Sequence, residues 1–325
     1  MKATFRQVYI YNLDVETGKK NAILPSLESL IAILERRRQA GQAHHTISKG
    51  SVDLAIGDIR IDPTNQLATI LIRYSDKDAA ESAYSNISGG TFTAHRKGAN
   101  EGGETGAHLF LSTAPERTMP NRYTCALEKT PNIDANLISR FVNKIIHDEY
   151  DADAQSFTFP NLAGQRTRAG DIALDRCLPR IELEGQPSET LERDVEEGRL
   201  TGITLSRAIA KTPMGGVPFL LKREASLKVE VDQDSLTGSI WQDVRRALRT
   251  ESDQYQTANI GIRLPGRKKT VSVKVATATA APLTELYVKS FDVWNINPAM
   301  AQSSETIALQ LESRVMTLVK DERDV

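Results

Sequence analysis

The chain has 325 residues, and its 41 basic and 42 acidic side chains leave a formal net charge of −1. This length allows about two domains, and 40% apolar residues are enough to form real hydrophobic cores. The balanced charge excludes a general electrostatic field that would attract nucleic acid or an anionic membrane, so either would have to bind at a local patch.

The sequence shows no pattern of a membrane span or a secretion signal. No stretch approaches the roughly 18 to 20 consecutive apolar residues that cross a bilayer, and the N-terminal MKATFRQVYIYNLDV lacks the apolar core of a signal peptide. Cys125 and Cys177 are too few for a disulfide framework and lack the CxxC spacing of zinc sites. We therefore expect a cytoplasmic protein with reduced cysteines and no direct membrane insertion.

The first half alternates strand and helix patterns. A helix is expected to begin after Ser26 as N-cap and to end at Gly41, because its apolar residues recur at helical spacing. A second helix is expected over about 133–149, where another broad apolar face occurs. Apolar runs at 4–12, 51–62, 67–76, 108–113 and 122–130 predict strands. These elements define an N-terminal α+β domain over 1–150.

The second half begins after a segment without periodicity. Residues 151–170 carry Pro and Gly and are predicted to be a linker. Residues 171–325 are predicted to form a C-terminal α+β domain with a basic helix and a hairpin. In this domain SLKVEVD alternates like a half-buried strand, and the C-terminal run from Ser303 favours a last helix, although its IALQL portion also fits a strand. The predicted fold class is therefore α+β, with two mixed α/β-layer halves and largely antiparallel sheets.

The glycine-rich stretch HRKGANEGGETGAHLF, residues 95–110, is the first candidate site. Its glycines match neither GxGxxG nor GxxxxGK[ST], and they lead into a strand rather than a helix. His95 and His108, with Glu101 or Glu104, lack the short spacing that prepares a zinc site. We expect a polar connection here, and we assign no cofactor, no metal and no catalytic residue to the chain.

A metal-dependent nuclease is a second possibility that uses carboxylates of the first half. Such chemistry needs acids on neighbouring strands to hold Mg²⁺. Asp53, Asp58 and Asp62 are candidates, together with Glu128 and Lys129 on a later strand. No E-x-K motif follows an apolar strand that contains an aspartate, so the spacing does not support this alternative.

Charge is segregated along the second half. Residues 180–200 hold seven acids against three bases, whereas 236–275 hold eight bases against three acids. In SIWQDVRRALRT, which opens with a predicted capping box from Ser239 to Gln242, the apolar residues occupy one helix face. Three arginines are therefore predicted to form a cationic ridge on the other face, namely Arg245, Arg246 and Arg249.

The segment ANIGIRLPGRKKTVSVKVAT predicts a hairpin that turns at Pro265-Gly266. Its alternation directs Arg263 and Lys274 outward and places Arg267, Lys268 and Lys269 at the tip. With the helix arginines these bases make a candidate nucleic-acid site suited to phosphate contact. Two alternatives remain open: the bases only solubilise a helix and an edge strand, or they meet the acidic 180–200 segment of another subunit.

The first half resembles uncharacterised prokaryotic proteins encoded in mobile elements and antiphage defence islands. The resemblance covers about residues 5–150 and rests on IRYSDKDAAESAYSN followed by ANEGGETGAHLFLS. EEGRLTGITLSR in the second half is loosely similar to defence proteins such as the cytosolic partner of the Kiwa system. The resemblance implies a bacterial cytosol and a role in recognising foreign nucleic acid or a phage protein, and it transfers no catalytic residue.

Together these observations predict a non-enzymatic component of a bacterial antiphage defence system that binds or senses nucleic acid, with DNA favoured over RNA. A homo-oligomer is expected, with a partner protein from the same operon as a further possibility. The alternatives are the metal-dependent nuclease and a structural adaptor whose charged segments pair subunits or a partner protein.

Overall fold

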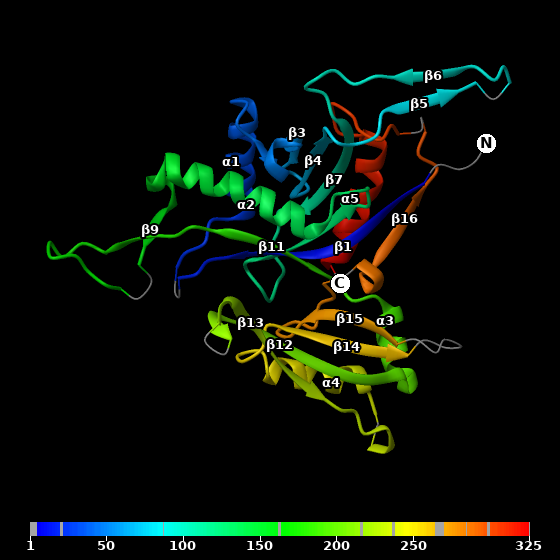
Figure 1. The fold of residues 1–325 in the computed structure, drawn as a ribbon. Helices are drawn as coiled ribbons and strands as arrows, with labels where there is room; N and C mark the ends of the chain where they lie inside the picture. The colour runs from blue at the N-terminus through cyan, green and yellow to red at the C-terminus, as the bar shows by residue number, and fades with distance from the viewer. Residues whose placement is uncertain are drawn as a thin grey trace. The chain divides into compact units, whose positions relative to one another are not determined.

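A computed structural model describes residues 5–19, 22–86, 88–161, 164–214, 217–235, 238–263, 270–283, 285–297 and 300–324. The chain divides into two compact units, of which the first is Met1–Leu183 with Phe291–Val325 and the second is Glu184–Ser290. Both combine helices with antiparallel sheets, which confirms the α+β class (Figure 1). Within the described ranges, no helix has the length and apolar character needed to cross a membrane.

The first unit is built on one large sheet. The described strands follow the order β11-β1-β8-β7-β4-β3-β2, and β16 also pairs with β1. The bounds are Phe5–Glu16 for β1, His44–Ile47 for β2, Val52–Asp62 for β3, Leu67–Asp76 for β4, Gly103–Ser112 for β7, Arg122–Glu128 for β8, Arg180–Gly185 for β11 and Ser290–Trp294 for β16. The strand predictions for the first half are thus largely confirmed.

Helices cover both faces of this sheet. Ala126 of β8 packs against α5 (Leu309–Asp324). Tyr123 lies three residues earlier and so points to the opposite face, where its hydroxyl accepts a hydrogen bond from the Leu27 amide at the start of α1 (Leu27–Gln39). Helix α2 (Ala135–Ala152) packs against α1.

Local sequence signals explain where these helices begin and end. The Ser26 hydroxyl accepts a hydrogen bond from the Ser29 amide and caps α1, as predicted. Gly41 follows α1 with a positive φ of 69°, a conformation that favours glycine. Asp134 caps α2 by accepting from the Leu137 amide. The first-half helices therefore follow the capping rules that the sequence suggested.

Two hairpins extend from the first unit, away from its main sheet (Figure 1). One joins β5 (Ser82–Ser85) to β6 (Phe92–His95), and the other joins β9 (Thr158–Pro160) to β10 (Leu174–Arg176). Phe157, just before β9, is buried against Tyr150 of α2. The predicted linker over 151–170 therefore contains ordered structure of the first unit.

The division of the chain differs from the predicted domains 1–150 and 171–325. Both β11 and β16 pair with β1, so the chain leaves and re-enters the same sheet beside one strand. The second unit is consequently an insertion into the first. The last helix, α5, belongs to the first unit because Leu311, Val315 and Val319 are buried in a core with residues of β1, β7 and β8. The strand alternative for IALQL is wrong, since α5 begins inside that motif.

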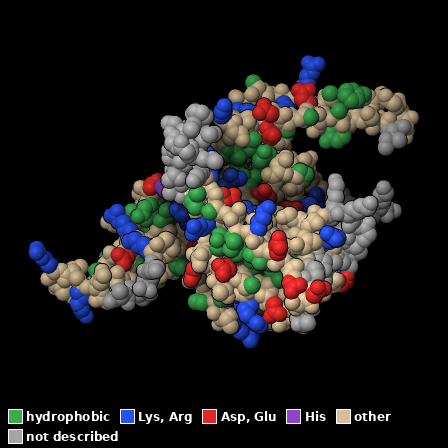
Figure 2. Space-filling model, turned by 60° about the horizontal axis from the view of Figure 1, so that its bottom comes forward, with side chains coloured by type: hydrophobic (Ala, Val, Ile, Leu, Met, Phe, Trp, Pro, Cys, Tyr) green, Lys and Arg blue, Asp and Glu red, His purple; other side chains and the backbone are tan. Residues whose placement is uncertain are grey.

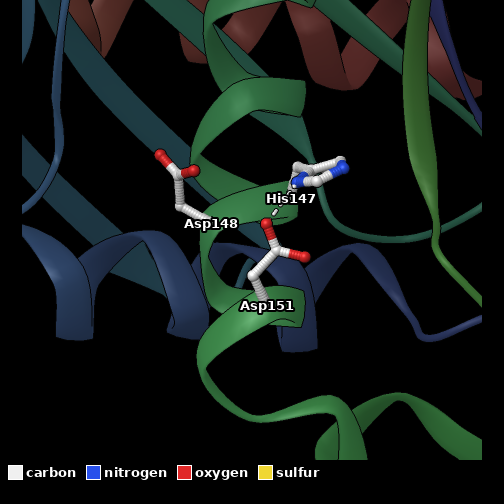
Figure 3. A group of neighbouring side chains, drawn as sticks. All are labelled: His147, Asp148 and Asp151. Carbon is white, nitrogen blue, oxygen red and sulfur yellow. Dashed lines mark ion pairs between the residues drawn. The ribbon is translucent and has the colours of Figure 1, made fainter.

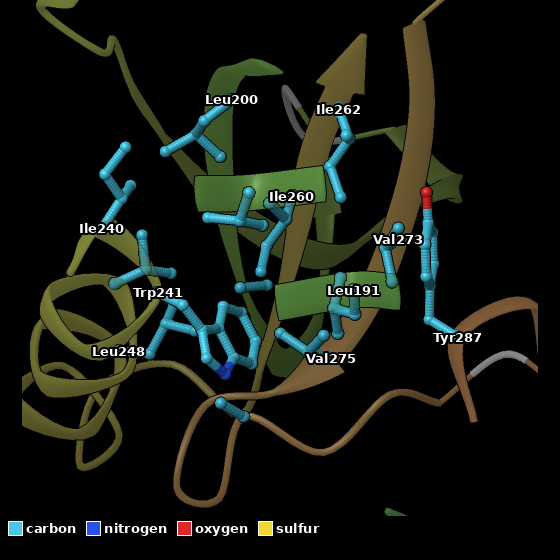
Figure 4. Close-up of a cluster of buried hydrophobic side chains, with 14 of the residues drawn as sticks. Leu191, Leu200, Ile240, Trp241, Leu248, Ile260, Ile262, Val273, Val275 and Tyr287 are labelled. Carbon is cyan, nitrogen blue, oxygen red and sulfur yellow. The ribbon is translucent and has the colours of Figure 1, made fainter. Parts of the chain in front are cut away.

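The second unit contains a smaller sheet in the order β13-β12-β14-β15. Its bounds are Leu200–Met214 for β12, Val217–Val229 for β13, Thr257–Arg263 for β14 and Thr270–Ala276 for β15, with helices α3 (Glu189–Asp194) and α4 (Ile240–Thr250). Figure 4 shows the core, in which Trp241 and Leu248 of α4 pack with Ile260 and Val273 of the sheet. Leu227 on the edge strand β13 stays 45% exposed, so this strand is less buried than its alternation predicted.

Candidate nucleic-acid interface

The predicted cationic ridge is present on α4. The apolar residues Trp241, Val244 and Leu248 are buried against the sheet. Arg246 and Arg249 are exposed on the other side of the helix, and Arg245 is partly exposed. We call Arg245, Arg246 and Arg249 the arginine ridge.

A shallow, open depression runs along the arginine ridge. Gln242 and Thr250 line it together with the three arginines. Gln242 was not predicted as part of the site, although it lies one turn before Arg246 and helical spacing could have identified it. Ala247 is one of the apolar residues expected on the buried helix face, but it is exposed because it lies at the margin of the apolar stripe. The depression therefore offers amide and hydroxyl groups beside the cations.

The charges of the arginine ridge are largely available to a ligand. Arg246 forms an ion pair with Asp243 at 3.3 Å, but both side chains are mostly exposed. Such a surface ion pair contributes little to stability, so Arg246 can readily exchange Asp243 for an anionic ligand. Within the part of the chain that the structure describes, Arg245 and Arg249 form no ion pair.

The N-terminus of α4 is held by a residue distant in sequence. Ser239 is the N-cap residue, but its side chain makes no capping hydrogen bond, so the predicted capping box is wrong. Instead the Glu196 carboxylate accepts hydrogen bonds from the Ile240 and Trp241 amides at 2.9 Å each, and from the Ser239 hydroxyl at 2.9 Å. The negative charge of Glu196 at this end of α4 also interacts favourably with the helix dipole.

Replacing Glu196 by glutamine should destabilise the second unit at neutral pH by about 1 kcal/mol, the usual scale of a lost cap. Burial raises the pKa of Glu196, but hydrogen bonds from Trp241, Ser239 and Ile240 outweigh it and lower the pKa overall. Because the pKa of Glu196 is lower in the folded than in the unfolded state, the ionised carboxylate stabilises the fold at pH values above its unfolded-state pKa of about 4.3. This stabilisation is lost as the pH falls through the folded-state pKa.

Urea unfolding between pH 7 and pH 3 in a W294F background, followed by Trp241 fluorescence, would measure this effect. The free energy of unfolding of the second unit should fall less between pH 7 and pH 3 in E196Q than in the parent. E192Q, an exposed substitution on the neighbouring helix α3, is the matched control and should behave like the parent. An unchanged pH profile in E196Q would show that the cap contributes nothing.

The predicted basic hairpin is confirmed in its strands. β14 and β15 pair with Ile260 opposite Val273 and Arg263 opposite Thr270. Ile260 and Val273 are buried, whereas Arg263 and Lys274 are exposed. The tip residues Arg267, Lys268 and Lys269, with the Pro265-Gly266 turn, lie outside the described residues.

The structure separates the described bases into two groups. Helix α4 packs on the sheet face that carries Ile260 and Val273. Side chains alternate along a strand, and register places Lys274 and Arg263 on the opposite face. The arginine ridge and these two bases therefore do not form the single surface that was predicted. Each group therefore forms a separate basic surface of the second unit.

The acidic 180–200 segment does not form one free acidic surface. Glu196 is used in capping α4, and Asp194 is buried, where its carboxylate accepts a hydrogen bond from the Tyr287 hydroxyl at 3.0 Å. On the face drawn in Figure 2, Lys and Arg side chains alternate with Asp and Glu, and neither kind gathers into one continuous patch. On this face, recognition of an anion therefore has to be local.

The carboxylates of the nuclease alternative do not converge. Asp53 and Asp62 lie near opposite ends of the single strand β3, and nine residues at about 3.3 Å each separate them by roughly 30 Å. Asp58 accepts a hydrogen bond from the Ile307 amide, and Asp62 accepts from Asn65. Glu128 is buried beside His108. Asp53 and Asp62 therefore cannot share one metal ion, and Asp58 and Glu128 are engaged in hydrogen bonds of the first unit.

The glycine-rich stretch 95–110 is only in part the polar connection that was expected. His95 is exposed on β6, but His108 is buried in β7. The His108 Nδ1 lies 2.6 Å from the Glu128 carboxylate. Glu104 binds Arg73 through two hydrogen bonds. The two histidines and their acidic neighbours thus serve different parts of the first unit and do not make a metal site.

Two further groups, a cluster of one histidine and two aspartates on α2 and the thiol of Cys125, are of residue types that can bind metals or act as nucleophiles. His147, Asp148 and Asp151 of α2 have ligand atoms within 4.8 Å of one another. His147 and Asp151 face each other as an ion pair in Figure 3, whereas Asp148 projects from another side of the helix and pairs with Lys144. Cys125 is fully buried, and burial raises its thiol pKa strongly, which makes it a poor nucleophile.

Comparisons with known proteins identify no relative. A scan against protein-family models found no match, and searches of curated proteins and of solved structures found none either.

Proposed function

We propose that the protein binds nucleic acid through the arginine ridge of α4. One observation carries the proposal: three arginines share the outward side of a well-anchored helix, around a depression that also presents Gln242 and Thr250. Guanidinium groups donate paired hydrogen bonds to phosphate oxygens. Amide and hydroxyl side chains commonly add further phosphate contacts.

The spacing of the ridge supports contact with successive phosphates. Arg245 and Arg249 lie one helical turn apart, which is a rise of about 6 Å. Nucleotides of one strand rise by roughly 3.4 Å each along the duplex axis, so two guanidinium groups on long, flexible side chains can contact neighbouring phosphates of one strand. Phosphate contacts fix position but carry no sequence information. We therefore expect the ridge to bind duplexes of unrelated sequence, with DNA favoured over RNA.

The wider role is proposed from the resemblance of the two halves to proteins of antiphage defence islands. On that basis the protein is a nucleic-acid-sensing component of a bacterial defence system, acts in the cytoplasm, and works as a homo-oligomer or with a protein from the same operon. The function needs no catalytic residue, metal or cofactor of the chain itself.

Charge reversal of the ridge tests the binding. The triple variant R245E/R246E/R249E should lose affinity for a labelled duplex by on the order of 100-fold at low salt, because phosphate contacts dominate such affinities. The fold should persist, since these side chains lie outside the core. Fluorescence anisotropy measures the affinity, and thermal melting verifies folding.

The double variant R263E/K274E is the matched control. It reverses exposed bases of the same unit on the opposite face of the sheet. We expect a much smaller loss of affinity than in the triple variant. Equal affinity of the triple variant and the parent would disprove the ridge as an interface, and a change of mass in solution would identify it as a subunit contact instead.

A further inference from the structure

The hairpin of β5 and β6, which we call the arm, is the most exposed ordered element of the first unit. Every residue of its two strands is exposed, including Tyr84 at 65% and Phe92 at 69%. Figure 1 shows the arm, drawn in cyan, extending beyond the main sheet. A two-stranded hairpin without a packed face is marginally stable in water. Its exposed rings therefore point to a function outside the core.

The root of the arm is held firmly. The Lys97 ammonium donates hydrogen bonds to the carbonyls of Lys77 and Ala79, which join the two ends of the arm. Gly102 and Gly103 allow the chain to cross close to β4, since a Cβ at Gly102 would lie 2.8 Å from the Asp76 backbone. The glycines of this stretch thus serve close packing at the root, and the arm begins from a defined base.

The chemistry of the arm suits an anionic partner. No Asp or Glu occurs from Ser82 to Asn100, although the whole chain holds 42 acids. Arg96, next to β6, is exposed. The strands SAYS and FTAH contain no Leu, Ile, Val or Met, and their other side chains are mostly small or polar. Charge complementarity therefore favours nucleic acid over a second copy of this chain.

One face of the arm is polar along its whole length. Register pairs Ser82 with His95 and Tyr84 with Thr93, so these four side chains share a face. The Tyr84 and His95 rings meet edge to face at 5.5 Å. Phe92 pairs with Ser85 and belongs to the opposite face. The Tyr84 face thus presents hydroxyl and imidazole groups at every position.

We propose that the arm enters the major groove of a bound duplex with its Tyr84 face toward the base edges. The major groove is wide enough for a two-stranded ribbon, and base edges there offer donors and acceptors to hydroxyl and imidazole groups. Arg96 then lies near the backbone at the mouth of the groove. This inference rests on the proposed nucleic-acid binding and gives the first unit a contact of its own, one that distinguishes sequences.

The double variant Y84A/H95A tests the arm in the full-length protein. Its affinity for a preferred duplex should fall about tenfold, and affinities for different sequences should become more alike, because base contacts are lost. The salt dependence of binding should stay unchanged, since no phosphate contact is removed. F92A is the matched control on the opposite face of the same arm and should have a smaller effect.

The outcomes separate the arm from the ridge. Loss of binding in R245E/R246E/R249E with parental affinity and parental sequence preference in Y84A/H95A would overturn the arm proposal alone. Failure of the parent protein to bind any duplex would overturn both proposals. A drop in oligomer mass in Y84A/H95A, measured by light scattering, would show that the arm contacts a second copy and not the groove.

Discussion

Replacing Glu128 by leucine should destabilise the first unit by about 2–6 kcal/mol, because each of two buried donors left without its acceptor costs roughly 1–3 kcal/mol. Glu128 is almost fully buried on β8. Its carboxylate accepts from the His108 amide at 3.2 Å and lies 2.6 Å from the His108 Nδ1. It also forms an ion pair with Arg6 at 3.4 Å. Leucine would leave the His108 amide and Nδ1 without this acceptor and would remove the carboxylate that pairs with Arg6.

The effect should extend to α5 through the His108 ring. The Nε2 atom accepts a hydrogen bond from the Ala308 amide at 3.1 Å, just before α5 begins. The ring therefore carries its proton on Nδ1, and this N–H donates a hydrogen bond to the Glu128 carboxylate. E128Q retains an acceptor oxygen and is the control, for which we expect a smaller loss.

Fluorescence can follow the first unit alone, because one tryptophan lies in each unit. Trp294 is in β16 of the first unit, and Trp241 is in the core of the second. In a W241F background, urea unfolding followed by Trp294 should show a much lower midpoint for E128L than for E128Q. Identical midpoints for the two variants would show that the carboxyl group has no stabilising role.

Replacing Val315 by aspartate should detach α5 from the main sheet. Val315 is fully buried and packs in one core with Val8 of β1 and Phe110 of β7. An unpaired carboxylate at this position costs several kcal/mol, on top of the lost apolar burial of roughly 1.5–3 kcal/mol. We therefore expect the first unit to unfold or to lose its C-terminal helix at room temperature.

The second unit should survive V315D, because its core contains no residue of α5. Limited proteolysis should cleave the C-terminal segment of V315D and leave a fragment that includes residues 184–290. T317D places the same charge on the exposed side of α5 and should resist cleavage like the parent. A protease-resistant V315D would contradict the packing of α5 on the sheet.

Local signals predicted much of the fold. Apolar spacing located α1 and α2, Ser26 and Gly41 marked the ends of α1, and alternation located the β14–β15 hairpin. The insertion of the second unit was not predictable in this way. It depends on β11 and β16 both pairing with β1, and pairing between strands so distant in sequence leaves no local pattern.

The candidate site could likewise be predicted only where local sequence patterns determine it. Helical spacing alone separates the arginine ridge from the buried stripe that contains Trp241 and Leu248. The capping of α4 by Glu196 spans 43 to 45 residues of sequence, so no local rule reveals it. The separation of Lys274 from the ridge does follow from the sequence, once α4 is known to cover the inner face of the hairpin.

The salt dependence of duplex affinity tests nucleic-acid binding by the ridge most directly. Each phosphate contact contributes about 0.9 to the slope of log affinity against log salt concentration. Losing three contacts should flatten the slope of R245E/R246E/R249E by roughly 2 to 3, whereas R263E/K274E should keep a slope close to that of the parent. Equal slopes for the parent and the ridge variant would contradict binding through α4.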